Sequence, residues 1–247
     1  MFGLGIDKKT MLIVLGVFLV LQLISSGTSG ILATLFTIPG VLIAITFHEF
    51  AHAYTAYKLG DDTPKMQGRL NLNPISHIDP FGFIFLILAG FGWGKPVEID
   101  PRNFNGKYSI SKAEAIVAAA GPISNFILAF ILLIIYYILQ LTGALSNLQP
   151  NIYLVVNYVM IYAITINIGL GVFNLIPLPP LDGSKILTNF LPYNAKQWFY
   201  NNQNIFYIIF LLIWITGLSS VILQPIFNAV FQGFSWAASS LIGLFIK

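Results

Sequence analysis

The sequence predicts an all-α polytopic membrane protein that forms a single domain over residues 1–247. Two observations lead to this prediction. Hydrophobic residues make up 57% of the chain and charged residues only 9%, whereas a soluble domain carries about 25% charged residues. Long apolar stretches also recur, and each approaches the roughly 17–25 residues that a helix needs to cross a bilayer. A chain with so few charges could not cover its surface in water, so we expect a lipid bilayer around it.

About six stretches are long and apolar enough to be transmembrane helices. They lie near residues 10–26, 31–57, 113–141, 152–176, 204–222 and 224–246. A shorter stretch, Phe81–Trp93, is interrupted by glycine, and we expect it to be a re-entrant or interfacial segment. The first stretch follows Lys8 and Lys9 and precedes a run of small residues, so a cleaved signal peptide is the alternative to a retained span.

The basic residues predict how these helices are oriented. They fall in alternate connections, while the connections 27–30 and 142–151 carry no charge. By the positive-inside rule, this pattern places both termini in the cytoplasm. We expect a multi-pass protein of a prokaryotic cytoplasmic membrane. The net charge of +3 comes without a run of lysine or arginine, so nucleic acid is not an expected partner.

The second predicted span contains the pattern H-E-x-x-H, formed by His48, Glu49 and His52. On a helix, the two histidines project from one face, and their imidazoles can bind one Zn²⁺ at roughly 2.0–2.1 Å. Glu49 then lies on a neighbouring face, where it can act as a base on a water molecule. In water this pattern could be a solvated helix face. In lipid, three polar groups would be desolvated without compensation, so we predict a metal site with one Zn²⁺ per chain.

A catalytic zinc needs a third protein ligand, and the chain has no cysteine to supply one. The polar candidates near membrane depth are His77, Asp79, Asn125, Asn167, Asn174 and Asp182. Asp182 is the best of these, because the fourth span ends towards the cytoplasm, at the depth expected for His48. Prolines before Asp182 break the helix, and Gly183 permits a sharp turn. The alternative role for Asp182 is the N-cap of a short helix over residues 184–190.

Three separated motifs make the chain resemble the site-2 protease family of intramembrane zinc proteases. They are F-H-E-F-A-H-A at 47–53, G-P-I-S-N at 121–125 and F-N-L-I-P-L-P-P-L-D-G at 173–183. The resemblance covers roughly residues 41–190 and implies a three-helix catalytic core, at about residues 31–190. It implies that His48, His52 and Asp182 bind zinc and that Glu49 is the catalytic base. The orientation of the spans places this site towards the cytoplasmic side.

The same resemblance implies roles for two asparagines. Asn125 would contact the scissile peptide or its oxyanion, although an interhelical hydrogen bond is an equally simple role for it. Asn174 would support the turn that contains Asp182 and Gly183.

Residues 70–82 also resemble the compact members of the family, which lack a PDZ or CBS module. We expect His77, with Asp79, to fix the re-entrant segment there, and a direct role of this pair in the chemistry is the alternative. Residues 66–73 and 97–100 alternate between polar and apolar side chains. This alternation predicts a small β-sheet at the membrane edge, where Leu70 and Leu72 would bind an extended substrate. Two ordinary cytoplasmic loops are the alternative.

The function expected from these features is zinc-dependent hydrolysis of peptide bonds in or near transmembrane segments of other membrane proteins. A transporter of zinc or another divalent metal is one alternative. An inactive relative that binds membrane helices without cutting them is another. A transporter would need polar groups distributed along a path across the membrane, whereas here they cluster at one depth.

Overall fold

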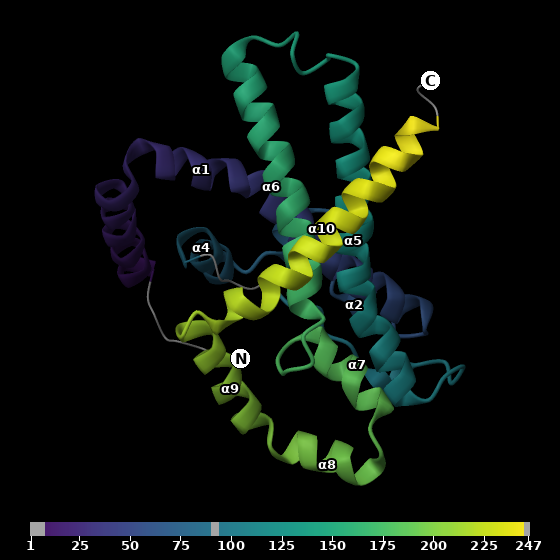
Figure 1. Cartoon of the computed structure of the whole chain (residues 1–247). Helices are drawn as coiled ribbons and strands as arrows, with labels where there is room; N and C mark the ends of the chain where they lie inside the picture. The colour runs from purple at the N-terminus through teal and green to yellow at the C-terminus, as the bar shows by residue number, and fades with distance from the viewer. Residues whose placement is uncertain (1–7, 90–93, 245–247) are drawn as a thin grey trace.

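The structure is a computed structural model that describes residues 8–89 and 94–244, and within these ranges helices are joined by turns and irregular connections (Figure 1). The helices before the connection at residue 142 are α1 (Lys8–Lys58), α2 (Thr63–Met66), α3 (Pro74–His77), α4 (Pro80–Ala89), the 3₁₀ helix η1 (Pro101–Asn103) and α5 (Ile110–Leu141). Those after it are α6 (Pro150–Asn174), α7 (Asp182–Phe190), α8 (Tyr193–Asn201), α9 (Gln203–Ile215) and α10 (Leu218–Gly243).

Helix α1 is two helical arms joined at Gly27, whose backbone has φ 61° and ψ −162°. A residue with a side chain rarely adopts this conformation, so glycine makes the sharp change of direction possible (Figure 1). The second arm, Ser29–Lys58, is long and apolar enough to cross a membrane. The first predicted span, near residues 10–26, falls in the other arm, where most side chains lie outside the described residues.

Helices α1, α5 and α6 pack together and form the core that the resemblance implies. Ser29–Lys58, Ile110–Leu141 and Pro150–Asn174 are the three candidate membrane spans among the described residues. They agree with the predicted spans 31–57, 113–141 and 152–176. Gly40 allows α1 to approach α6 closely, because a Cβ atom there would lie 2.8 Å from the Cα atom of Ala163. Small residues at such contacts are typical of helices that pack inside a membrane.

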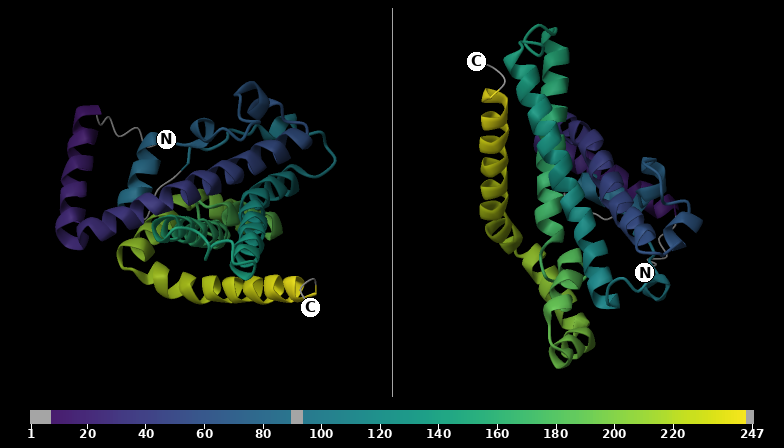
Figure 2. Two further views of the ribbon diagram at one scale, coloured as in Figure 1. Left: turned by 90° about the horizontal axis from the view of Figure 1, so that it is seen from above. Right: turned by 90° about the vertical axis from the view of Figure 1, so that its right-hand side faces the viewer.

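The C-terminal part of the chain differs from the prediction. Two separate spans were expected at 204–222 and 224–246, but α9 and α10 meet at a break and are bent by 82°. Gly217 lies at this break with φ 73°, a left-handed conformation that ends α9. The described residues therefore offer three candidate spans, or four if the bent pair is one span, and the expected six are not found. Helix α10 packs along α5 and α6 (Figure 2).

The predicted membrane-edge sheet is also not found, since no strand is assigned in residues 66–73 or 97–100. A single antiparallel bridge joins Ile78 to Gly94. Residues 71–75 turn instead of pairing, because the Asn71 side chain accepts from the N–H of Asn73 (2.8 Å) and Asn73 in turn caps α3. Asparagine side chains compete with strand pairing in this way. The expected re-entrant segment contains α4, and its residues 90–93 lie outside the described part.

The segment 94–105 is fastened to the end of α1 by the buried carboxylate of Asp61. One carboxylate oxygen accepts from the backbone N–H of Asp100 (2.8 Å), and the other accepts from the side chain of Asn103 (3.0 Å) and from Thr63. Burial by itself would raise the pKa of Asp61, but these hydrogen bonds outweigh it and hold the pKa below its ordinary value. The carboxylate therefore stabilises the fold in its ionised form.

Replacing Asp61 by asparagine should lower the free energy of unfolding at pH 7 by about 1–3 kcal/mol, because buried donors lose a charged acceptor. The native pKa lies below the unfolded value of about 3.9, so this contribution is present above that pH and is lost as the pH falls through the native pKa. In thermal unfolding in detergent micelles, the difference in Tm between the wild type and the Asp61→Asn variant should shrink as the pH falls below about 4. Asp62→Asn is the control, since Asp62 is exposed and makes no capping hydrogen bond. A gap that persists unchanged at low pH would contradict the assignment.

Candidate metal centre and cavity

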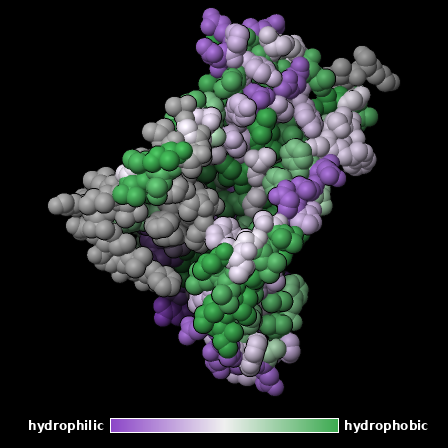
Figure 3. All heavy atoms as spheres, turned by 60° about the vertical axis from the view of Figure 1, so that its left-hand side comes forward, coloured by the Kyte–Doolittle hydropathy of each residue, from purple (hydrophilic) through white to green (hydrophobic). Residues whose placement is uncertain are grey.

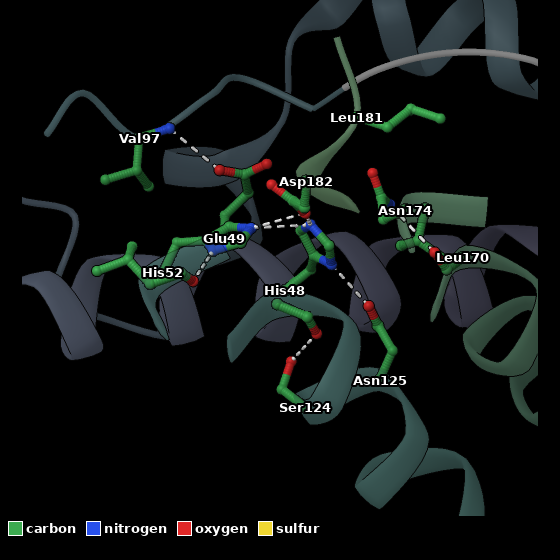
Figure 4. A network of polar contacts seen from close by, with 12 residues as sticks. His48, Glu49, His52, Val97, Ser124, Asn125, Leu170, Asn174, Leu181 and Asp182 are labelled. Atoms are coloured by element: carbon green, nitrogen blue, oxygen red, sulfur yellow. Dashed lines mark hydrogen bonds and ion pairs between the residues drawn. The ribbon is translucent and has the colours of Figure 1, made fainter. Parts of the chain in front are cut away.

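His48 and His52 lie one turn apart on α1, and the start of α7 brings Asp182 to them (Figure 4). One oxygen of Asp182 is 3.1 Å from Nε2 of His48 and 3.2 Å from Nε2 of His52, and the two Nε2 atoms are 3.0 Å apart. Three ligands on one tetrahedral zinc ion are separated by roughly 3.3 Å when each bond is about 2.0 Å long. The three residues predicted as ligands therefore have the spacing of one metal site.

The hydrogen bonds of the two imidazoles leave both Nε2 atoms facing this site. The Nδ1–H of His48 donates to Oδ1 of Asn125 (2.7 Å), and the Nδ1–H of His52 donates to the carbonyl oxygen of Val117 (2.7 Å). The amide of Asn125 is oriented by its NH₂ group, which donates to the carbonyl oxygen of Ala44 (3.0 Å). Both partners of Nδ1 are acceptors, so each Nε2 carries a lone pair that can bind a metal.

Asp182 is not the N-cap of α7, and its carboxylate lies against the two histidines. The N-cap of α7 is Leu181, and Asp182 is the first helical residue, with no capping hydrogen bond. Its Oδ2 atom is buried and faces the two Nε2 lone pairs, with no N–H or O–H donor among the described residues. An unpaired buried carboxylate oxygen is costly unless a cation compensates it. This oxygen, next to two Nε2 lone pairs, fits a divalent metal ion.

Two glycines permit the close packing around these ligands. A Cβ atom at Gly121, on α5, would lie 2.4 Å from Nε2 of His52 and 2.7 Å from Cε1 of His48. A Cβ atom at Gly183 would lie 2.3 Å from the carbonyl oxygen of Leu175. The expected role of Gly183 in a sharp turn thus comes from its missing side chain, which lets α7 begin against the end of α6.

Asn125 makes the interhelical hydrogen bonds that were one of the two roles expected for it. Its side chain is fully buried, and it bonds to His48, to Ala44 and to Oδ1 of Asn167 (2.9 Å). It does not line the cavity described below. With its oxygen and NH₂ group occupied in this way, Asn125 is placed to orient His48, and its contact with the scissile peptide stays a prediction. The interhelical hydrogen bond considered from the sequence is the geometry observed.

Glu49 points to the same side of α1 as the metal site. Its Oε2 atom accepts a hydrogen bond of 3.1 Å from the backbone N–H of Val97 (Figure 4). Nothing in the sequence pattern identified Val97 as a partner of Glu49. The contact comes from a backbone group, which a motif cannot reveal.

A cavity of about 640 Å³ opens beside these residues. His48, Glu49, His52 and Asp182 all line it, and most of its remaining wall is apolar. The wall is built by α1, α5, α6, the segment 94–101, the turn before α7, and the aromatic side chains Phe210 and Trp214 of α9. Figure 3 shows a hollow among mainly apolar side chains on this side of the molecule. The cavity therefore lies directly beside the candidate metal site.

Of the remaining predicted residues, Asn174 lines the cavity, whereas Leu70, Leu72 and His77 do not. Pro96, Val97 and Ile99 line it in place of the two leucines. The fully buried His77 has a structural contact, since its Nε2–H donates to the carbonyl oxygen of Asn71 (2.7 Å). Burial lowers the pKa of His77, which favours its neutral form. The NH₂ group of Asn174 donates within its own helix, to Leu170 (3.1 Å).

Comparisons with known proteins identify the family of the chain. The model of peptidase family M50 matches residues 36–217. The chain is 41% identical over 194 residues to "Putative zinc metalloprotease YwhC" of Bacillus subtilis, covering 76% of this chain and 84% of that protein. It is 30% identical over 175 residues to "Putative zinc metalloprotease Rip2" of Mycolicibacterium smegmatis, covering 65% of this chain and 62% of that protein. No solved structure matches the chain significantly. The zinc cofactor expected from the sequence is confirmed by these relatives together with the three grouped ligands.

Replacing Gly121 by alanine should abolish zinc binding, because the added methyl group would displace both imidazoles. Metal analysis of the purified protein should fall from about one zinc per chain to near zero. Gly169→Ala is the matched control. Gly169 also lines the cavity, but a Cβ atom there meets nothing within 4 Å. Full zinc content in the Gly121 variant would show that the imidazoles are not packed against α5 as described.

Replacing Asn125 by leucine should weaken zinc binding by about 10- to 100-fold, because His48 loses the acceptor that orients it. Competition with a zinc chelator of known affinity measures the change. Asn174→Leu serves as the comparison, since that amide bonds only within its own helix in the contacts described. Equal affinities for the two variants would remove Asn125 from the positioning of His48.

Proposed function

Because the chain belongs to peptidase family M50, the site-2 protease family, we propose that it is a zinc-dependent endopeptidase that cleaves other membrane proteins in or near their transmembrane segments. One observation carries the proposal: the three ligand atoms and the carboxylate of Glu49 line the same cavity within the helical core. Metallopeptidases need a metal-binding group and, next to it, a carboxylate that is not a metal ligand and can act as a base. The candidate spans of α1, α5 and α6 support a location in the bilayer.

The residues of the chain have distinct tasks in this reaction. His48, His52 and Asp182 would hold the metal, and bound Zn²⁺ would supply Lewis-acid polarisation of the scissile carbonyl and of a water molecule. Glu49 accepts the proton from the attacking water and delivers it to the nitrogen of the departing amine. Asn125 and the carbonyl of Val117 keep the two imidazoles in the tautomer and orientation that binding requires.

The cavity supports a substrate in extended rather than helical form. In a helix, each peptide carbonyl accepts an internal hydrogen bond and is shielded by neighbouring side chains. A transmembrane substrate must therefore unwind locally before its carbonyl can reach the site. The apolar wall suits the side chains of such a segment and limits the access of water. The proposed orientation has both termini and the site on the cytoplasmic side, as the basic residues predict.

Two variants test the assignment in proteoliposomes that contain a panel of single-span reporter proteins. Glu49→Gln should retain one zinc per chain and lose cleavage by at least about 100-fold, because the amide cannot accept the proton. Asp182→Ala should lose both zinc and cleavage, because two histidines remain as ligands.

Cleavage by the Glu49 variant at the wild-type rate would remove that residue from the mechanism. Zinc flux through wild-type vesicles without cleavage would favour a transporter. Tight binding of reporters with neither flux nor cleavage would favour an inactive relative.

A further inference from the structure

Arg69 is a buried charged residue that does not belong to the metal site. It follows α2, only 3% of its surface is exposed, and its backbone N–H donates to the carbonyl oxygen of Pro64 (2.8 Å). Removing a guanidinium group from water is costly unless hydrogen bonds and nearby charges compensate. Its burial therefore indicates a specific set of partners.

Those partners are two consecutive carbonyl groups in the segment that borders the cavity. The Nη2 group of Arg69 donates to the carbonyl oxygens of Lys95 and Pro96, the second at 2.9 Å. The N–H of Lys95 donates to the carbonyl oxygen of His77 (2.9 Å), which holds the same segment from a second point. The guanidinium also interacts electrostatically with the carboxylate of Glu49. Arg69 thus fixes the backbone just before Val97.

We call the hydrogen bonds from Arg69 to the carbonyl oxygens of Lys95 and Pro96 the clamp. The residue that follows it in the chain donates a hydrogen bond to Glu49. Pro96 has no N–H, so Val97 offers the first donor after the two clamped carbonyls, and it donates to Oε2 of Glu49. The segment also passes very close to Glu49 at Gly94, where a Cβ atom would lie 3.3 Å from Oε1. The position of the Glu49 carboxylate therefore depends on where Arg69 holds the segment.

We propose that Arg69 is a positioning residue for Glu49, acting through the carbonyls of Lys95 and Pro96 and the N–H of Val97. The inference rests on the proposed peptidase function. A glutamate side chain has several rotatable bonds, and one fixed donor removes much of that freedom. Without the clamp, Glu49 would still be present, but it would occupy the orientation needed for proton transfer for less of the time. Arg69 touches neither metal ligands nor the cavity in the described contacts.

The test measures kcat, KM and zinc content of the full chain in proteoliposomes, with a reporter that the wild type cleaves. Arg69→Met should lower kcat by about 10- to 100-fold, the scale expected for a misplaced catalytic group, with KM and zinc content unchanged. Val97→Pro, which removes the N–H, should lower kcat to the same extent. Val97→Ala shortens the same cavity-lining side chain but keeps the N–H, so its kcat should exceed that of Val97→Pro by about 10-fold or more. The double variant Arg69→Met/Val97→Pro should be no slower than Val97→Pro alone, because both changes break one connection.

The proposal is overturned if Arg69→Met or Val97→Pro keeps the wild-type kcat. It is also overturned if Arg69→Met loses zinc in step with activity. A third contrary result is a double variant in which the two losses of kcat multiply. If Arg69→Met does not fold, the two Val97 variants decide, since equal kcat in the proline and alanine variants rejects the connection. Failure of the proposed function has a different signature, because then the zinc-loaded wild type cleaves no reporter at all.

Discussion

The structure depends on how two imidazoles can be held inside an apolar helical core. A buried histidine needs a partner for each ring nitrogen, and here the Nδ1 atoms find theirs on α5, at Asn125 and Val117. The Nε2 atoms are thereby directed at each other and at Asp182. This arrangement is acceptable only if a cation lies between them, because lone pairs and a carboxylate would otherwise be gathered in a poorly solvated place. The hydrogen bonds that orient the two imidazoles for a metal are therefore also contacts that pack α1 against α5.

Close helix approach is what makes those contacts possible. Gly121 leaves the space that the imidazoles fill, and Gly40 lets α6 come near α1. The carboxylate of Asp182 arrives from a third direction because Gly183 packs on the carbonyl oxygens that end α6. At each of these glycines, a neighbouring group occupies the space that a side chain would otherwise fill. The site therefore requires three helices at short range, and no single helix could supply it.

Local patterns predicted the parts of the protein that depend on local spacing. The one-turn separation of His48 and His52 follows from helix geometry, and the three central spans follow from apolar length. Asp182 could be chosen because few polar residues exist at that depth. Asn125 was harder to assign, since a motif names the residue but not which of several buried groups its amide will meet. Arg69 and the N–H of Val97 gave no signal, because their contacts join segments 26–48 residues apart through the backbone.

The errors in the predicted fold have similar causes. The apolar stretch from residue 204 onwards contains no charge that would mark a break, and only the left-handed conformation of Gly217 divides it. Alternation in residues 66–73 suggested a strand, but asparagine side chains bonded the backbone into turns. The helix pattern was interrupted by the backbone conformation of one residue, and the strand pattern was overridden by hydrogen bonds from side chains to the backbone.

The attachment of segment 94–105 to α1 has a mechanical consequence. Asp61 ties one part of the segment to the end of that helix, and Glu49 meets another part of it from the helix itself. When a membrane becomes thinner or thicker, a long helix adjusts by tilting. A tilt of α1 would carry its two histidines, Glu49 and the tethered segment together as a unit. The distance between the carboxylate of Glu49 and the N–H of Val97 would therefore stay unchanged during such a tilt.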